Sequence, residues 1–322
     1  MEVLVVGNTA YVDDDFCAKA FPEDHVQVVA AQDTRRDESS PHASWKELLQ
    51  HLDQAYEFER VVYLSNYLTP HTDSVGDIEL LRMVFRACAG RRVQLLYVAG
   101  PAGAEGAADA AGRTGKGIIA HAANDLCRYY AAREGVQTKI LRAPFLYTAS
   151  AALEDPFLVP LFDACSTGSV ALQGAQDAAF PLLCAEELAV LVRRIFDSWD
   201  GNFETFDIAD TFHHTAGEVG EALKALFLGL SVAYGDSAGY AMPVSDIVRV
   251  RYGWFQRYDL LRDLSTIQAR WDAGRAKKVN PLRAAIDRIQ MRSLPIKCLE
   301  TGLAWALFEL LEHLFSQSAQ LN

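Results

Sequence analysis

The sequence has little positive charge: 30 lysines and arginines stand against 42 aspartates and glutamates, and the net charge is −12. Nucleic-acid binding relies on basic patches, so this balance argues against a nucleic-acid partner. No uncharged apolar stretch approaches the roughly 18 residues of a membrane span. Glu2 precedes a short β-like run without the basic region of a secretory signal. We therefore expect a cytoplasmic protein with neither a membrane nor a nucleic-acid partner.

Grouped cysteines are also lacking. The six cysteines form no CxxC pair, and none belongs to a His/Cys cluster with the spacing of metal ligands. Most lie in apolar contexts, so we expect buried free thiols and no metal site. The six are Cys17, Cys88, Cys127, Cys165, Cys184 and Cys298.

The turn after the first apolar run has only one of the three glycines expected there, and this is the most informative shortage in the sequence. An apolar run that ends in Gly at the start of a chain is typical of a dinucleotide-binding βαβ unit, in which glycines recur three residues apart. Here the three positions are Gly7, Ala10 and Asp13. The remaining candidate cofactor contacts in this turn are Thr9, Tyr11 and Val12.

Acidic residues follow in this turn, since Asp14 and Asp15 come directly after Asp13. Their charge would repel a pyrophosphate from the helix N-terminus that normally attracts it. The alternative is that Asp13 simply caps the helix. Both interpretations predict that NAD or NADP binds weakly, if it binds.

Strand and helix patterns alternate along the first half of the chain, which predicts a parallel sheet. With 322 residues, half of them hydrophobic, the chain can bury one large α/β core and a smaller lobe. The expected strands are Val3–Val6, Val26–Ala30, Arg60–Leu64, Gln94–Val98 and Thr138–Leu141. The expected helices are 14–20, 45–56, 76–89 and 118–134, and a loop of mostly Ala and Gly covers 101–117.

Four later segments carry a family resemblance. Residues 133–147 contain Gly135, then Ile-Leu-Arg142 and Pro-Phe-Leu-Tyr147. Residues 180–193 run from a strand into an acid-rich helix, and residues 203–218 contain a strand and the start of a second helix. Arg251-Tyr-Gly-Trp254 precedes a closing helix. Together these resemble the extended short-chain dehydrogenases/reductases, the NAD-dependent epimerase/dehydratase family. The resemblance implies a Rossmann-like doubly wound parallel sheet, a smaller C-terminal α/β lobe and, here, extra C-terminal helices.

The resemblance also implies a catalytic set that this sequence lacks. Family members carry a Tyr four residues before a Lys on one helix of the Rossmann-like core, and a Ser or Thr at the end of the strand that precedes this helix. Counting back from Gly135 and Arg142 puts Lys116 and Ala120 at the Tyr and Lys positions. The strand ends Ala99-Gly100, without a hydroxyl group. The nearest substitutes for an acid/base are Lys116 and His121, and His121 has the alternative of a surface role.

Other residues lie at the cofactor and substrate positions that the resemblance implies. Asp33 lies 26 residues beyond Gly7, where an acid binds a ribose, and Arg35 after it would instead meet a 2′-phosphate; the alternative is an ordinary polar loop. Ser65 and Asn66 replace a small pair beside the cofactor. The resemblance places Gly100, Arg142 and Arg251 at the substrate pocket, and Arg142 has the alternative of a buried ion pair.

The sequence predicts three regions: 1–150 as the dinucleotide-binding-type core, 151–280 as the smaller lobe and 281–322 as a helical extension. Leucines recur at helical spacing through residues 296–315. This apolar face would cover the protein itself, form a homodimer contact, or lead to a further domain or protein partner.

Two functions from different classes follow. The first is a relative that has lost the Tyr/Lys/Ser set and acts as a non-catalytic nucleotide-sensing, scaffold or regulatory domain. The second is an active NAD(P)-dependent epimerase, dehydratase or reductase of a nucleotide-sugar or similar small substrate, with non-standard acid/base residues. Because a positioned acid/base contributes about 10²–10⁴-fold to a rate, its absence favours the first.

Overall fold

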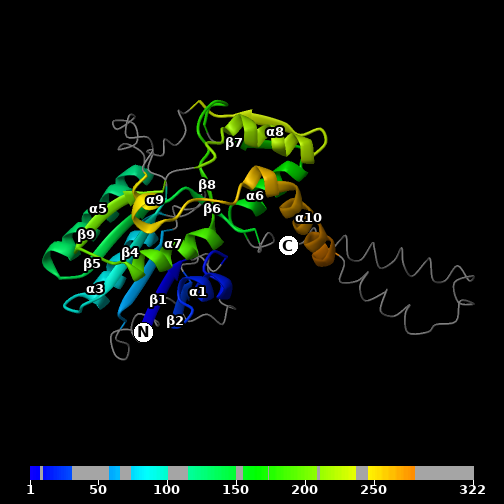
Figure 1. Cartoon of the computed structure of the whole chain (residues 1–322). Coiled ribbons are helices and arrows are strands. Elements are labelled where there is room, and N and C mark those ends of the chain that lie inside the picture. Colours follow the sequence, from blue (N-terminus) through cyan, green and yellow to red (C-terminus); the bar gives the residue numbers. More distant parts are fainter. Residues whose placement is uncertain are drawn as a thin grey trace, which may run out of the picture. The chain divides into compact units, whose positions relative to one another are not determined.

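The computed structural model of the chain describes residues 1–7, 10–30, 58–65, 74–100, 115–149, 155–172, 174–208, 211–236 and 246–279. Contacts divide the chain into two units, Met1–Trp271 and Asp272–Asn322. The expected helix over 45–56 and the extension from 281 onward lie outside the described residues. Figure 1 shows the elements of the chain and their order.

A six-stranded parallel sheet forms the centre of the first unit. It contains β1 (Glu2–Gly7), β2 (His25–Ala30), β3 (Arg60–Leu64), β4 (Gln94–Ala99), β5 (Gln137–Arg142) and β9 (Phe203–Asp207). The order is β2-β1-β3-β4-β5-β9, and every neighbouring pair is parallel. The apolar runs form strands because both faces of the sheet are covered: Val3 through Val6 are at most 1% exposed. The doubly wound α/β fold predicted from the sequence is confirmed.

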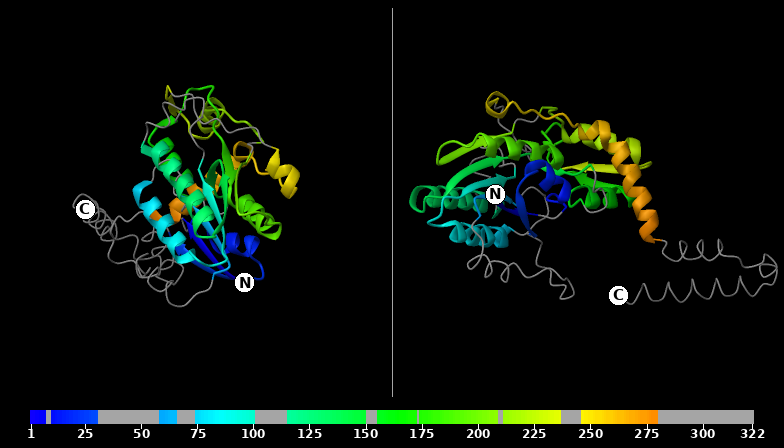
Figure 2. Two further views of the ribbon diagram at one scale, coloured as in Figure 1. Left: turned by 90° about the vertical axis from the view of Figure 1, so that its left-hand side faces the viewer. Right: turned by 60° about the horizontal axis from the view of Figure 1, so that its bottom comes forward.

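Helices cover both faces of this sheet (Figure 2). On one face, α3 (Ser74–Cys88) and α5 (Gly115–Arg133) pack against the strands through a core that includes Leu81, Phe85 and Cys127. On the other, α1 (Asp14–Ala20), α7 (Ala185–Asp197) and α9 (Ile247–Tyr252) share a second core with the strands. The expected helices 14–20, 76–89 and 118–134 are therefore present, with ends that shift by at most three residues.

A smaller α/β lobe follows. Its strands pair in two short parallel sets, β6 (Phe145–Tyr147) with β8 (Leu182–Cys184) and β7 (Ser169–Leu172) with β10 (Ser231–Tyr234). Its helices are α6 (Leu158–Ser166), α8 (Ala216–Leu226) and α10 (Leu260–Val279). Phe162, Phe227 and Trp271 pack ring against ring at its centre.

The thiols behave as the sequence predicts within the described part of the chain. Cys88, Cys127, Cys165 and Cys184 are buried and free, and Cys17 is free and half-buried. Among the described residues there is no group of three or more side chains arranged to hold a metal ion. None of the described helices is long and apolar enough to cross a membrane.

Candidate functional site

The carboxyl ends of the parallel strands gather several of the predicted site residues along one edge of the sheet. Gly7 ends β1, Ser65 follows β3, Gly100 follows β4 and Arg142 ends β5. Register pairs Leu64 with Val98 and Ala99 with Arg142, so these ends are level with one another. This edge is where open α/β sheets bind ligands. Thr9, Asp33, Arg35 and Asn66 lie outside the described residues.

Gly7 is required by packing. A methyl group on its α-carbon would lie 3.0 Å from Cβ of Leu64 and 3.4 Å from a methyl group of Val12. Leu64 is itself 1% exposed and cannot readily move away. The first glycine of the turn therefore keeps its structural role whether or not a cofactor binds.

Tyr11 and Val12 bury their side chains in the core, each 2% exposed. The Tyr11 hydroxyl donates to the carbonyl oxygen of Leu146 at 2.9 Å, which joins the first turn to β6. Ala10 is half-buried. Tyr11 and Val12 could therefore meet a ligand only through their backbone, while their side chains stabilise the fold.

Asp13 is the N-cap of α1. Its carboxylate accepts the backbone N–H of Phe16 at 2.8 Å, so that N–H is no longer free for an anion. Asp14 and Asp15 occupy the first turn, and Asp15 pairs with Lys19 at 2.5 Å. Burial, followed by the charges of Asp13 and Asp14, raises the pKa of the Cys17 thiol to about 11. Asp13 therefore caps the helix, and Asp14 and Asp15 add two further acidic side chains at the same end.

Ser65 uses its hydroxyl group within the protein. It donates to Asp77 Oδ2 at 2.9 Å, and the Tyr63 hydroxyl donates to Asp77 Oδ1 at 2.7 Å. Ser65 and Asp77 are each 2% exposed, and Asp77 lies in the first turn of α3. Sequence reasoning did not identify Asp77, since an acid in the first turn of a helix is ordinarily solvated.

The expected catalytic helix is α5. Gly135, with φ of +72°, turns the chain between α5 and β5, so counting back from it stays within a continuous helix. Lys116 and Ala120 occupy the positions implied for Tyr and Lys, and His121 is exposed. The tyrosines of α5 are Tyr129 and Tyr130, near its other end, where Tyr130 stacks on Phe85 with ring centroids 4.7 Å apart.

Arg142 forms an ion pair with Asp207 at the carboxyl ends of β5 and β9. Its Nε lies 2.5 Å from Oδ1, and its Nη2 donates to Oδ2 at 2.9 Å. The two side chains are 23% and 12% exposed. The guanidinium therefore already has a carboxylate partner at the position where an anion contact was expected.

The structure does not place Arg251 with Gly100 and Arg142. It binds Asp200 and Glu204, and Glu204 lies three residues before Asp207 on β9. The same carboxylates accept from Lys139 at 2.9 Å each. Lys139 is 1% exposed, and burial by itself lowers the pKa of its ammonium group. The hydrogen bonds to Asp200 and Glu204 raise this pKa by more, so the net pKa lies above its ordinary value. This cluster attaches α9 to the sheet.

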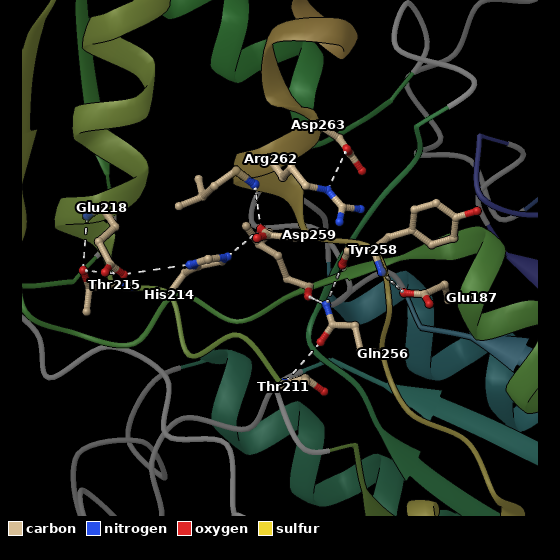
Figure 3. Close-up of polar contacts among 12 residues, drawn as sticks. Glu187, Thr211, His214, Thr215, Glu218, Gln256, Tyr258, Asp259, Arg262 and Asp263 are labelled. Carbon is tan, nitrogen blue, oxygen red and sulfur yellow. Dashed lines mark hydrogen bonds and ion pairs between the residues drawn. The ribbon is translucent and has the colours of Figure 1, made fainter.

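The loop before α8 carries two consecutive histidines, His213 and His214, in different surroundings. Figure 3 shows the ring of His214 between two acids: Nε2 lies 2.7 Å from Asp259 Oδ1, and Nδ1 lies 3.9 Å from Glu218 Oε2. Glu218 also forms a capping box with Thr215 at the start of α8, and Asp259 accepts the N–H of Leu261 in α10. His213 is exposed, with φ of 53°.

No protein-family model matches the chain, and no curated protein matches its sequence. Solved structures do match. A dTDP-glucose 4,6-dehydratase, DesIV of Streptomyces venezuelae with NAD bound, matches with a TM-score of 0.65 at 13% identity, over 88% of this chain and 100% of that one. MoeE5, in complex with UDP-glucose and NAD, gives 0.63 at 15% identity over 86% and 100%.

A UDP-glucose 4-epimerase of Thermotoga maritima gives a TM-score of 0.62 at 14% identity, again over 86% of this chain and 100% of that one. At such identities the likeness concerns the fold. The resemblance expected from the sequence is confirmed at that level: this chain has the fold of the NAD-dependent epimerases and dehydratases of nucleotide sugars.

Proposed function

We propose that this chain is a degenerate member of the extended short-chain dehydrogenase/reductase family that has lost catalysis. It would act as a nucleotide-sensing, scaffold or regulatory protein. The observation that carries the proposal is the composition of α5: Lys116 and Ala120 stand on the helix before β5, where the family has its Tyr and Lys. Gly100, beyond β4, has no hydroxyl to orient a substrate oxygen.

The internal contacts at the sheet edge support the same proposal. Asp13 accepts an N–H of α1, Ser65 donates to Asp77, and Arg142 pairs with Asp207. Each of these polar groups thus already has a hydrogen-bond partner within the protein. NAD, which the structures of DesIV and MoeE5 hold, would bind here weakly, as would NADP, because the turn after β1 carries a methyl group at Ala10 and a carboxylate at Asp13.

The competing function is an active NAD(P)-dependent epimerase, dehydratase or reductase. One observation favours it: α5 carries an amine at Lys116, four residues before Ala120, and a lysine can act as a general base when its pKa is lowered. His121, being exposed, is a poorer candidate.

A non-catalytic role requires a partner. From the sequence, residues 281–322 carry an apolar helical pattern, and we propose this segment as the contact with a second copy, a further domain or another protein. Dimerisation through helices is the first arrangement to test, by measuring the mass of the full chain and of a chain that ends at residue 280 in solution.

Calorimetry with NAD(H) and NADP(H) tests the cofactor part of the proposal. The full chain is compared with an Ala10→Gly/Asp13→Gly double variant, which restores the glycine pattern. Glycine is itself an acceptable N-cap, so Asp13→Gly should cost the helix only a few tenths of a kcal/mol relative to other good caps. The matched control is Ala10→Gly/Asp14→Asn, because Asp14 is exposed in the same turn and its loss removes one charge without restoring a glycine.

We expect little or no binding by the natural sequence and a clear gain in the double variant that exceeds the gain in the control. Micromolar binding by the natural sequence would contradict the weakened site and favour the enzyme. Absence of binding in every variant would place the obstruction elsewhere along the sheet edge and leave the scaffold role.

A further inference from the structure

Asp155 is a fully buried carboxyl group that the proposed function does not use. It is 0% exposed and lies between the end of β6 and the start of α6. Its Oδ2 accepts the backbone N–H of Thr148 at 2.5 Å. Its Oδ1 accepts the N–H groups of Phe157 and Leu158, at 2.7 Å each. The side chain therefore closes the N-terminus of α6, whose N-cap residue Phe157 supplies no side-chain cap.

Among the described residues no cation pairs with this carboxylate, and the hydrogen bonds that it accepts come from backbone N–H groups. Arg270 of α10, the cation bound beside this segment, donates instead to the carbonyl oxygen of Ala149. A buried charge without a counter-ion favours the protonated form, whereas hydrogen bonds from N–H groups favour the ionised form. Burial is the larger effect, and it raises the pKa of Asp155 from 3.8 to about 6 despite the bonds from Leu158, Thr148 and Phe157. The group therefore changes its charge just below neutrality.

The Asp155 charge also reaches the first turn of the chain. Tyr11, 2% exposed, anchors that turn to β6 through the carbonyl of Leu146. Burial and then the charge of Asp155 raise the pKa of Tyr11 well above its ordinary value. Tyr11 is the titratable group that faces Asp155 from this turn, while the ends of β6 and α6 present uncharged N–H groups.

The two carboxyl oxygens are not equivalent. Oδ1 accepts two N–H groups of α6, and Oδ2 accepts one, from Thr148. A proton costs least on the oxygen with fewer donors around it, because a protonated oxygen is a weaker acceptor and its hydrogen crowds an incoming N–H. Protonation at Oδ2 would weaken the bond to Thr148 and keep the cap on α6.

We propose that Asp155 is a proton-operated latch: ionised, it ties the segment after β6 to the start of α6, and protonated at Oδ2 it releases Thr148 while still capping the helix.

The test follows the backbone amides of Thr148, Phe157 and Leu158 by NMR on the full chain between pH 4.5 and 7.5. We expect the Thr148 amide to titrate near pH 6 and to exchange with solvent faster on the acid side than the Leu158 amide does. In Asp155→Asn this titration should vanish. In the control Asp163→Asn, which alters an exposed acid on the same helix, it should persist.

A Thr148 amide that does not respond to pH, or that responds equally in Asp155→Asn, would overturn the proposal. If Asp155→Asn fails to fold, the natural chain with isotope-labelled aspartate carboxyls decides the question. One carboxyl that titrates near pH 6 supports the latch, and titration of every aspartate below pH 5 contradicts it.

The stability of the chain gives a second readout. Because the folded-state pKa lies above the unfolded one, the folded state binds the proton more tightly between the two values. The unfolding equilibrium constant should therefore rise by about tenfold per pH unit from about pH 4 to about pH 6 and then level off. The difference between the natural chain and Asp155→Asn isolates this contribution from that of other acids.

Discussion

The interior of the central sheet has the residues that its fold requires, whereas the carboxyl edge of the sheet departs from the residues that the family resemblance implies. In the interior, Leu96, Val62 and Ile140 are at most 1% exposed, as the apolar strands of a doubly wound sheet with both faces covered should be. At the edge, Gly100 has no hydroxyl group, Ala10 carries a methyl group in place of a glycine hydrogen, and Arg142 bonds within the protein. Burial of strands supplies most of the folding free energy, whereas ligands bind at strand ends. The residues at the strand ends can therefore change while the buried strands stay the same, so the fold alone does not establish the activity.

The largest effect should come from the interior. Leu96→Ala removes a fully buried side chain of β4, and we expect a loss of about 2–5 kcal/mol of unfolding free energy, measured by chemical denaturation. The control His121→Ala, at an exposed position on α5, should stay within about 0.5 kcal/mol. If both changes cost the same, the contrast between interior and surface would be wrong.

A middle-sized effect should come from the edge itself. Removing the acid of the Arg142–Asp207 pair by Asp207→Asn leaves a half-buried guanidinium with a weaker acceptor, and we expect a loss of about 1–3 kcal/mol. The double-mutant cycle with Arg142→Met measures the coupling. Non-additivity of about 1 kcal/mol or more would show that Arg142 is a structural group, whereas additive losses would leave Arg142 available as an anion contact.

Strands and most helices could be predicted because their signal is local. Val3–Val6 is an apolar run between turn residues, and Thr215 with Glu218 is a capping box within one turn of helix. Asp13 was harder, because the sequence alone fits both a helix cap and an acid that repels a phosphate. The contact with Phe16 confirms the cap, and the repulsion stays a prediction.

The remaining polar contacts depend on pairs far apart in the sequence. Lys139 looks out of place in an apolar strand until Glu204, 65 residues later, lies beside it. His214 meets Asp259 across 45 residues. Neither pairing leaves a spacing pattern that a single sequence can reveal, and the bonds of Arg251 to Asp200 and Glu204 are long-range in the same way.

The smallest effect concerns pH. Hydrogen bonds from Arg251 and then Lys139 lower the pKa of Asp200 to about 2. Because the folded value lies below the unfolded one, the stabilisation is present above about pH 4 and disappears as the pH falls toward 2. Asp200→Asn should therefore flatten the loss of stability over that interval, measured by denaturant midpoints. Asp246→Asn, at an exposed pair with Arg249, is the control. Equal acid dependence in the natural chain and in Asp200→Asn would contradict the assigned role.

Turnover tests the central claim most directly. The purified chain is incubated with NAD or NADP and a panel that contains UDP-glucose and dTDP-glucose, and both the sugar products and the reduced nicotinamide are followed. The account predicts no product and no reduced cofactor, because α5 carries Lys116 and Ala120 in place of the acid/base pair. Product formation that Lys116→Ala abolishes would contradict it and establish an enzyme with a different proton donor.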